Sequence, residues 1–206
     1  LGQVFFGFHA SHIELKHAND RCEALLSFWA EPLMTANFLL GAKYDAGFLW
    51  QAWEYMLQNQ AHDSICGCSI DQVHKDMMNR FDQSLLLGED IVKRNMKPVA
   101  MAQSATCDIE GAQIAHIFNP AGREVNGATV FELRIPSPRP ERFKLIAPDG
   151  SEAAWQIINE QKGMHEVETN WNCIPRFPQK DRLTIAADLQ IPASGLAAYQ
   201  IIPNPR

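Results

Sequence analysis

The spacing of the apolar residues changes near residue 100, and this change constrains the fold more than any other feature of the sequence. Before that point apolar residues recur every three or four positions, as they do on one face of a helix. After it, short apolar and β-branched stretches alternate with turns rich in Gly and Pro, which is typical of antiparallel strands. We therefore predict an α+β chain, with a helical domain at residues 1–100 and a β domain at residues 101–206.

The first domain is expected to be a three-helix bundle with short connections. The predicted helices cover residues 13–30, 46–60 and about 69–97. Pro32 should end or restart the first helix, because proline has no backbone N–H to donate. Ser69 and Gln72 fit a capping box at the start of the third helix, which should fade before Pro98.

The second domain is expected to be a small antiparallel β-sandwich or sheet. Its predicted strands cover residues 114–118, 129–135, 143–146, 154–158, 182–187 and 197–202. Two of the connections, residues 119–122 and 148–150, have the Asn, Pro, Asp and Gly content of tight turns.

Charge and cysteine content exclude several classes of protein. The net charge is −6 and no long run of Lys or Arg occurs, so a surface for nucleic acid or anionic membrane is not expected. No stretch approaches the roughly 20 apolar residues of a membrane span. The five cysteines are an odd and mostly scattered set, which indicates reduced thiols in a cytoplasmic protein. The chain begins at Leu1 without an initiator Met, so we expect further sequence upstream.

Reactive side chains are densest at residues 59–69, between the second and third predicted helices. A loop held by two packed helices is a suitable place for a ligand or catalytic group. His62 can offer a neutral imidazole to a metal, and Asp63 can accept hydrogen bonds from sugar hydroxyls. Local chemistry alone favours a structural alternative, in which both residues cap helix ends.

A self-contained structural zinc site is a further alternative at this loop. Its tetrahedral ligands would be His62, Cys66, Cys68 and His74. The spacing disfavours it, because structural zinc sites usually place two to four residues between paired cysteines and here there is one. Such a short spacing instead favours a tight turn with closely packed small side chains.

Several segments of the chain match the pattern of one enzyme family in the order in which they occur. They are residues 14–19, 29–32, 49–53, 60–69, 73–74, 80–81 and 118–120. Together they resemble the glycoside hydrolase family 38 α-mannosidases, in particular the bacterial branch that includes mannosylglycerate hydrolase-like members. The chain departs from this pattern at His12, where relatives often have Arg. His12 weakens the case for an identical substrate unless it only begins a helix.

This resemblance implies part of a zinc-dependent retaining enzyme that hydrolyses terminal α-mannosidic bonds. His62 would match the family's zinc ligand that follows the catalytic barrel, and Asp63 would match the Asp that contacts hydroxyls of bound mannose. The remaining zinc ligands, the nucleophile and the acid/base would lie upstream in an N-terminal α/β barrel. No catalytic residue is therefore expected in this chain, which alone should be inactive and should self-associate through an apolar helical face left exposed.

A different class of function is a non-catalytic carbohydrate-binding or scaffold module, in which the β domain acts and His62 has no role. Trp155 and Trp171 could then form a surface on which sugars stack, although scattered aromatic residues in a sandwich more often belong to the core. Glu166 and Glu168 are interpreted as a solvated strand face.

Overall fold

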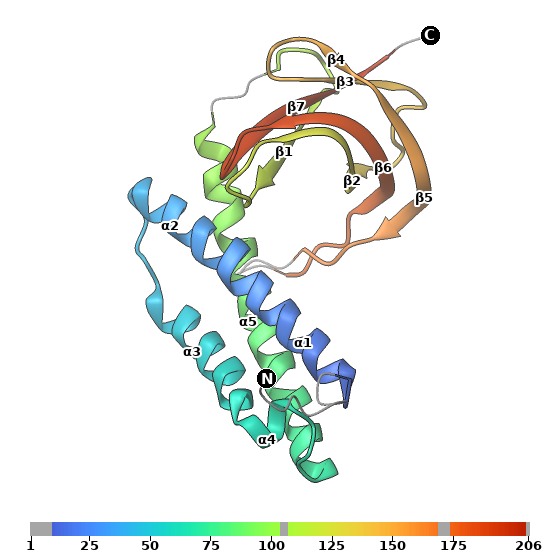
Figure 1. Cartoon of the computed structure of the whole chain (residues 1–206). Helices are drawn as coiled ribbons and strands as arrows, with labels where there is room; N and C mark the ends of the chain where they lie inside the picture. The colour runs from blue at the N-terminus through green and yellow to red at the C-terminus, as the bar shows by residue number, and fades with distance from the viewer. Residues whose placement is uncertain (1–9, 104–106, 169–173, 205–206) are drawn as a thin grey trace, which may run out of the picture. The chain divides into compact units, whose positions relative to one another are not determined.

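The chain folds into two compact units, with the boundary between residues 103 and 104. A computed structural model describes residues 10–103, 107–168 and 174–204 (Figure 1). Helices make up the first unit and antiparallel strands the second, which confirms the predicted α+β class. Among the described residues, no helix combines the length and the apolar character needed to span a membrane.

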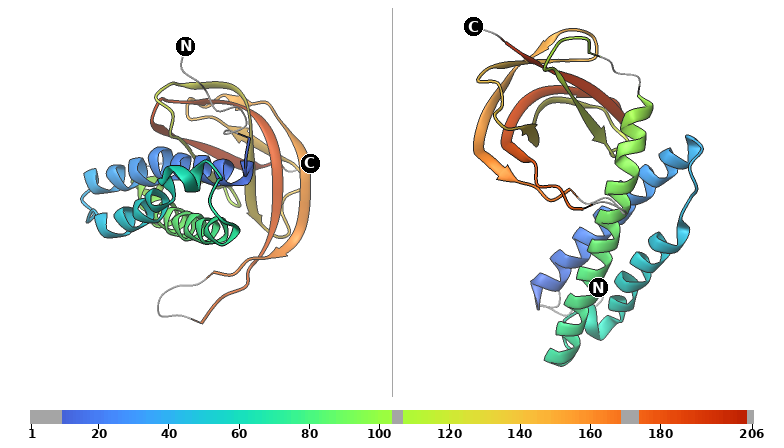
Figure 2. Two further views of the ribbon diagram at one scale, coloured as in Figure 1. Left: turned by 60° about the horizontal axis from the view of Figure 1, so that its bottom comes forward. Right: turned by 180° about the vertical axis from the view of Figure 1, so that it is seen from behind.

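The helical unit is divided into more segments than the sequence predicts, so a three-helix bundle is not confirmed. Its segments are α1 (Ile13–Ala24), the π-helix η1 (Leu25–Ala30), α2 (Glu31–Leu39), α3 (Ala46–Leu57), the 3-10 turn η2 (Gln58–Gln60), α4 (His62–Ile65) and α5 (Asp71–Ala102). Figure 2 (right) shows α3 (cyan) running alongside α5 (green), with the short α4 at the lower end of α3.

Pro32 does not end the helical run, but the α-helix restarts at this point after the π-helical segment, in agreement with the second form of the expectation. It stands in the first turn of α2, and the helical backbone passes from α1 through η1 into α2 without a break. A π-helical turn is wider than an α-helical turn, because its hydrogen bonds span five residues. The missing N–H of proline is accommodated directly after this wider turn.

The beginning of α5 also differs from the prediction, and the capping box of Ser69 and Gln72 is wrong. Ile70 precedes the helix in an extended conformation, and no side chain caps it. The backbone N–H of Ser69 instead donates to the carbonyl oxygen of Asp63, at 3.1 Å, which holds Ser69 in the preceding loop. At its other end, α5 continues past Pro98 to Ala102.

Apolar faces of the helices meet in buried clusters. Phe81 of α5 is fully buried and packs with Leu15 of α1 and Met56 of α3. Gly88 allows α5 to approach η1 closely, because a Cβ at this position would lie 2.7 Å from Cδ2 of Leu25. Other large apolar side chains of this unit stay exposed: Phe28, Phe38, Leu39, Leu40, Phe48, Trp50 and Leu57.

Two antiparallel sheets form the second unit. The first contains β1 (Gln113–Asn119), β7 (Gly195–Pro203), β3 (Phe143–Ile146) and β4 (Glu152–Ala153), in that order. The second contains β2 (Val125–Pro136), β6 (Gln179–Ile191) and β5 (Trp155–His165), in that order. Burial alternates along β6, so that every second residue from Asp181 to Ile191 points inward. Apolar side chains from both sheets share one core, which includes Leu133, Leu145, Leu183 and Tyr199.

Candidate functional site

The loop between α3 and α5 carries the residues that the sequence singles out. Ala61 has an extended conformation and separates η2 from α4, so the chain turns sharply just before His62. The one-turn α4 then presents His62 and Asp63 in its first two positions. The short α4, which begins with these two residues, lies in the connection between α3 and α5 (Figure 1).

Asn59 fixes the base of this loop. Its side chain is completely buried, and its Nδ2 donates to the carbonyl oxygen of Met77 at 3.0 Å. Its Oδ1 accepts a hydrogen bond from Nε of Arg80 at 2.7 Å. A buried amide is costly unless both of its polar atoms are bonded, and here both are. Asn59 therefore ties η2 to α5, a role that the sequence does not indicate because the partners lie 18 and 21 residues away.

His62 and Asp63 project into solvent. Their side chains are 90% and 67% exposed, and Nε2 of His62 lies 3.3 Å from Oδ1 of Asp63. The residues at the N-caps of α4 and α5 are Ala61 and Ile70, so neither His62 nor Asp63 occupies the N-cap of these helices. The imidazole and the carboxylate are consequently accessible to a ligand from outside this unit.

Cys66, Gly67 and Cys68 bring two thiols together beside Asp63. Gly67 has a φ of 88°, a left-handed conformation that glycine adopts without a Cβ clash. The two Sγ atoms lie 2.9 Å apart, and Sγ of Cys68 lies 3.4 Å from Oδ1 of Asp63. Contact with the Cys66 thiol, desolvation and the Asp63 carboxylate together raise the pKa of the Cys68 thiol to about 11.

The start of α1 supports the loop at Gly67. His12 stands at the N-cap of α1 with a φ of 47°, and the Oγ of Ser11 donates to the carbonyl oxygen of Gly67 at 3.4 Å. The rings of His12 and His74 lie with their centroids 4.1 Å apart. His74 is buried, and both of its ring nitrogens lack a hydrogen-bond partner among the described residues.

The four-ligand zinc site considered from the sequence is not assembled in the structure. Among the described residues, the ligand atoms of Asp63, Cys66 and Cys68 gather within 4.8 Å of one another, and they form a group without His62 or His74. The ring of His74 is instead buried against His12. The observed group thus contains the two cysteines of the four-ligand alternative, with the Asp63 carboxylate in place of the two histidines.

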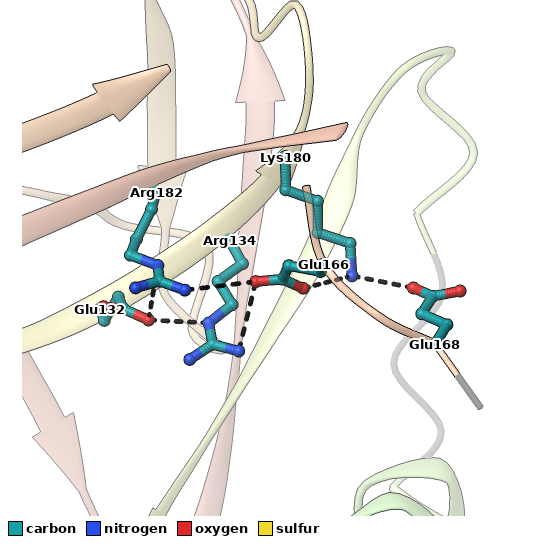
Figure 3. Close-up of polar contacts among 6 residues, drawn as sticks. All are labelled: Glu132, Arg134, Glu166, Glu168, Lys180 and Arg182. Atoms are coloured by element: carbon teal, nitrogen blue, oxygen red, sulfur yellow. Dashed lines mark hydrogen bonds and ion pairs between the residues drawn. The ribbon is translucent and has the colours of Figure 1, made fainter. Parts of the chain in front are cut away.

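The β unit holds a second cluster of ionisable groups, which Figure 3 shows. The Glu166 side chain is only 15% exposed and lies 3.3 Å from Arg134, 3.1 Å from Lys180 and 3.9 Å from Arg182. Lys180 also contacts Glu168 at 3.0 Å. The interpretation of Glu166 as part of a solvated strand face is therefore wrong, because cations surround its carboxylate.

One face of Trp155 is taken up by a neighbouring aromatic ring. Its ring is stacked on that of Phe143, with centroids 4.0 Å apart and an angle of 10° between the planes. It packs against the core shared by the two sheets. Trp171, the other aromatic residue considered for sugar stacking, lies outside the described residues.

Comparison with known proteins assigns the helical unit to a family. Residues 3–99 match the model of the α-mannosidase middle domain. A curated protein of Halalkalibacterium halodurans, named provisionally as a mannosylglycerate hydrolase, is 35% identical over 105 residues, which are 50% of this chain and 11% of that protein. Mouse α-mannosidase 2C1 is 30% identical over 186 residues, which are 87% of this chain and 16% of that protein. The chain thus spans a small part of the length of these curated relatives.

Solved structures share the fold. An α-mannosidase from Enterococcus faecalis V583 superposes with a TM-score of 0.81 at 24% identity, over 94% of this chain and 24% of the other. A glycosyl hydrolase family 38 protein from Enterococcus faecalis has a TM-score of 0.79 at 23% identity, over 99% of this chain and 26% of the other. The chain therefore belongs to the glycoside hydrolase family 38 α-mannosidases, and residues 3–99 form the middle domain of that family.

Proposed function

We propose that this chain is part of a zinc-dependent retaining α-mannosidase that hydrolyses terminal α-mannosidic bonds. The observation that carries the proposal is the position of His62, in the connection between α3 and α5 with a side chain 90% exposed. An imidazole in this position can complete the coordination of a metal held mainly by another part of the enzyme. The names of both curated relatives describe hydrolysis of a mannoside.

The donor atoms in this connection suit this role. Neutral imidazole is a common zinc ligand, and zinc bound there would act as a Lewis acid toward sugar oxygens. Nε2 of His62 is within 3.3 Å of Oδ1 of Asp63, so the neighbouring carboxylate could hold the ring in position or turn toward the substrate. Asp63, with an exposed carboxylate, would accept hydrogen bonds from hydroxyls of the bound mannose and thereby orient the ring.

The reacting carboxyl groups would come from an N-terminal α/β barrel of the same polypeptide. Retaining hydrolysis requires a nucleophile and an acid/base about 5–5.5 Å apart, and the resemblance places both upstream of this chain. The role of this chain is then to deliver one zinc ligand and one sugar contact. It contributes binding and orientation, while the barrel contributes bond cleavage.

Exposed apolar side chains on the helical unit support contact with such a barrel. Leu39 of α2 is 78% exposed and Trp50 of α3 is 69% exposed. Large exposed apolar groups often mark an interface, and the same groups would drive homo-oligomers when the barrel is absent. A cytoplasmic location would suit the free thiols of Cys22, Cys66, Cys68 and Cys107.

Replacing His62→Ala in the polypeptide that contains both barrel and chain tests the proposal. We expect bound zinc to fall, and hydrolysis of an aryl α-mannoside to drop by more than the roughly 10–100-fold that loss of an outer-sphere partner of a metal costs. His17→Ala, at an exposed histidine of α1, is the matched control and should leave both properties unchanged. Normal zinc content and activity in His62→Ala would contradict the proposal and favour a non-catalytic carbohydrate-binding or scaffold module.

A further inference from the structure

Three side-chain atoms that could bind a metal ion lie close together in the loop that follows His62, and the His62 ring is not one of them. They are a carboxylate oxygen of Asp63 and the Sγ atoms of Cys66 and Cys68, all within 4.8 Å of one another. Cys66 is buried and is therefore held in place by its neighbours. Cys68 is exposed, so the group can be reached from solvent. Thiolate sulfur and carboxylate oxygen are both ligands that zinc and related cations accept.

The backbone holds these three residues in place. The N–H of Cys66 donates to the carbonyl oxygen of His62 at 3.0 Å, and the N–H of Cys68 donates to that of Asp63 at 3.1 Å. Between them, the left-handed Gly67 reverses the chain, so that the side chains of Cys66 and Cys68 meet although one residue separates them. This geometry removes the objection that the sequence spacing raised against two cysteines acting together.

The distances fit a tetrahedral cation after a small adjustment. Two sulfurs bound to one zinc lie about 3.8 Å apart, and a sulfur and a carboxylate oxygen lie about 3.6 Å apart, for bonds of roughly 2.3 and 2.1 Å. The corresponding distances here are 2.9 Å and 3.4 Å. Rotation of the exposed Cys68 side chain can open the first of these distances, because this side chain is not packed in the core.

The charges around the group also favour a cation. Each of the three side chains can supply an anionic ligand atom, a carboxylate oxygen from Asp63 and a thiolate sulfur from Cys66 and from Cys68. In the described part of the chain, the Asp63 carboxylate lies against His62 and Cys68 and is not paired with a Lys or Arg. A divalent cation would stabilise the thiolate forms and offset their charge and that of the carboxylate, and it would bind with release of the thiol protons.

We propose that Asp63, Cys66 and Cys68 form a binding site for one thiophilic divalent cation, such as Zn²⁺ or Cd²⁺. This site is separate from the metal to which His62 is proposed to contribute, since its ligand group does not include His62. Under the proposed function, the bound cation would occupy the carboxylate of Asp63 and keep it from the sugar. Thiophilic metal would then inhibit the enzyme through a residue of the substrate site.

Titration of the reduced chain with CdCl₂ tests this site, with the ultraviolet charge-transfer absorption of cadmium–thiolate bonds as the readout. We expect saturation at one Cd²⁺ per chain. Cys68→Ser should weaken binding by more than the roughly 10–100-fold cost of losing an outer-sphere partner. Cys68 is exposed, so this variant should fold, and its far-ultraviolet circular dichroism verifies that.

Two control variants make the result specific. Cys107→Ser removes a free thiol of the β unit, and His62→Ala removes the neighbouring imidazole, and both should retain the full absorption and stoichiometry. The inference is overturned by the absence of stoichiometric binding, by unchanged binding in Cys68→Ser, or by loss of binding in either control. Because His62→Ala retains cadmium here but should lose zinc and activity in the longer polypeptide, this site and the proposed function can fail independently.

Discussion

The loop around Asp63 and the network around Glu166 are both clusters of ionisable groups, but they are built in opposite ways. Glu166 is 15% exposed and is surrounded by Arg134, Lys180 and Arg182, so its charge is neutralised within the fold (Figure 3). Asp63 is 67% exposed and lies beside a histidine and a thiol. The charges of the first cluster are paired within its own unit, whereas the second leaves its carboxylate and imidazole exposed to solvent.

The largest expected effect concerns Asp181, another carboxylate that the β unit satisfies internally. Its residue is 3% exposed, and its carboxylate accepts the backbone N–H groups of Gly163 at 2.8 Å and Arg139 at 3.0 Å. Asp181→Asn turns one acceptor into a donor, and we expect a loss of roughly 3 kcal/mol in the free energy of unfolding at neutral pH. Urea unfolding of the natural protein and of the Asp181→Asn variant measures this loss.

The effect at Asp181 should depend on pH in a defined direction. The hydrogen bond from Gly163 is the main cause that lowers the pKa of Asp181 in the folded chain. The advantage of the natural residue is therefore complete above the unfolded pKa of about 4 and is lost as pH falls through the lower folded value. Asp188→Asn, at an exposed position of the same strand, should change little at any pH. Equal losses in the two variants would contradict this account.

A smaller loss is expected for Gly67→Ala, which tests the conformation of the Cys66 loop. Alanine in the left-handed region costs about 1–2 kcal/mol, and here its Cβ would also lie 2.9 Å from Oγ of Ser11. Gly41→Ala is a matched control, because Gly41 has a φ of 97° but a Cβ added there would meet no described atom within 4 Å. Thermal unfolding should show a larger loss at Gly67, and equal losses would show that the contact with Ser11 is unimportant.

Glu166→Gln should cost about 1 kcal/mol, since partly exposed ion pairs contribute modestly even in a network. Added salt should reduce the difference from the natural chain, because exposed members of the network are screened. Denaturant unfolding at low and high ionic strength measures both values. Glu124→Gln replaces an exposed carboxylate outside the network as the control. A salt-independent difference would indicate a loss of packing instead of charge pairing.

The smallest effect on stability is expected for Asp63→Asn, within about 0.5 kcal/mol, because the side chain is exposed. Its chemical effect should be clear nevertheless. The pKa of the Cys68 thiol, about 11 in the natural chain, should fall partway, since contact with Cys66 remains the leading cause of its elevation. The pH dependence of Cys68 alkylation measures this change. Asp71→Asn, in the first turn of α5, should leave the profile unchanged.

The spacing of apolar residues was sufficient to predict the bounds of some helices and strands. The strand predicted at 143–146 is β3 as observed, and the helix predicted from Ala46 corresponds to α3 followed by η2. By contrast, β6 runs from Gln179 to Ile191, well beyond the predicted 182–187. All of its extra residues except Gln179 pair with the long β2, from Val125 to Pro136, and this pairing partner cannot be read from the local sequence.

Part of the candidate site could be predicted from the sequence. Residue types at the loop indicated His62 and Asp63 as ligands, and their roles stay predictions. The contacts that shape the loop could not be predicted, because they join residues distant in sequence, as between Asn59 and Arg80. The contact between the thiols of Cys66 and Cys68 depends on the positive φ of Gly67. This backbone angle cannot be predicted from the fact that one residue separates the two cysteines.

The π-helix η1 has a consequence for how the family's sequences should be aligned. A π-helical turn holds about one residue more than an α-helical turn of the same height. Deleting one residue between Leu25 and Ala30 would let the segment become α-helical while α1 and α2 keep nearly the same relative rotation, because the same turn is then completed with one residue fewer. Leu15 and Leu33 would therefore both stay buried. Homologues with a one-residue gap at this position should keep the same apolar pattern on both sides of it.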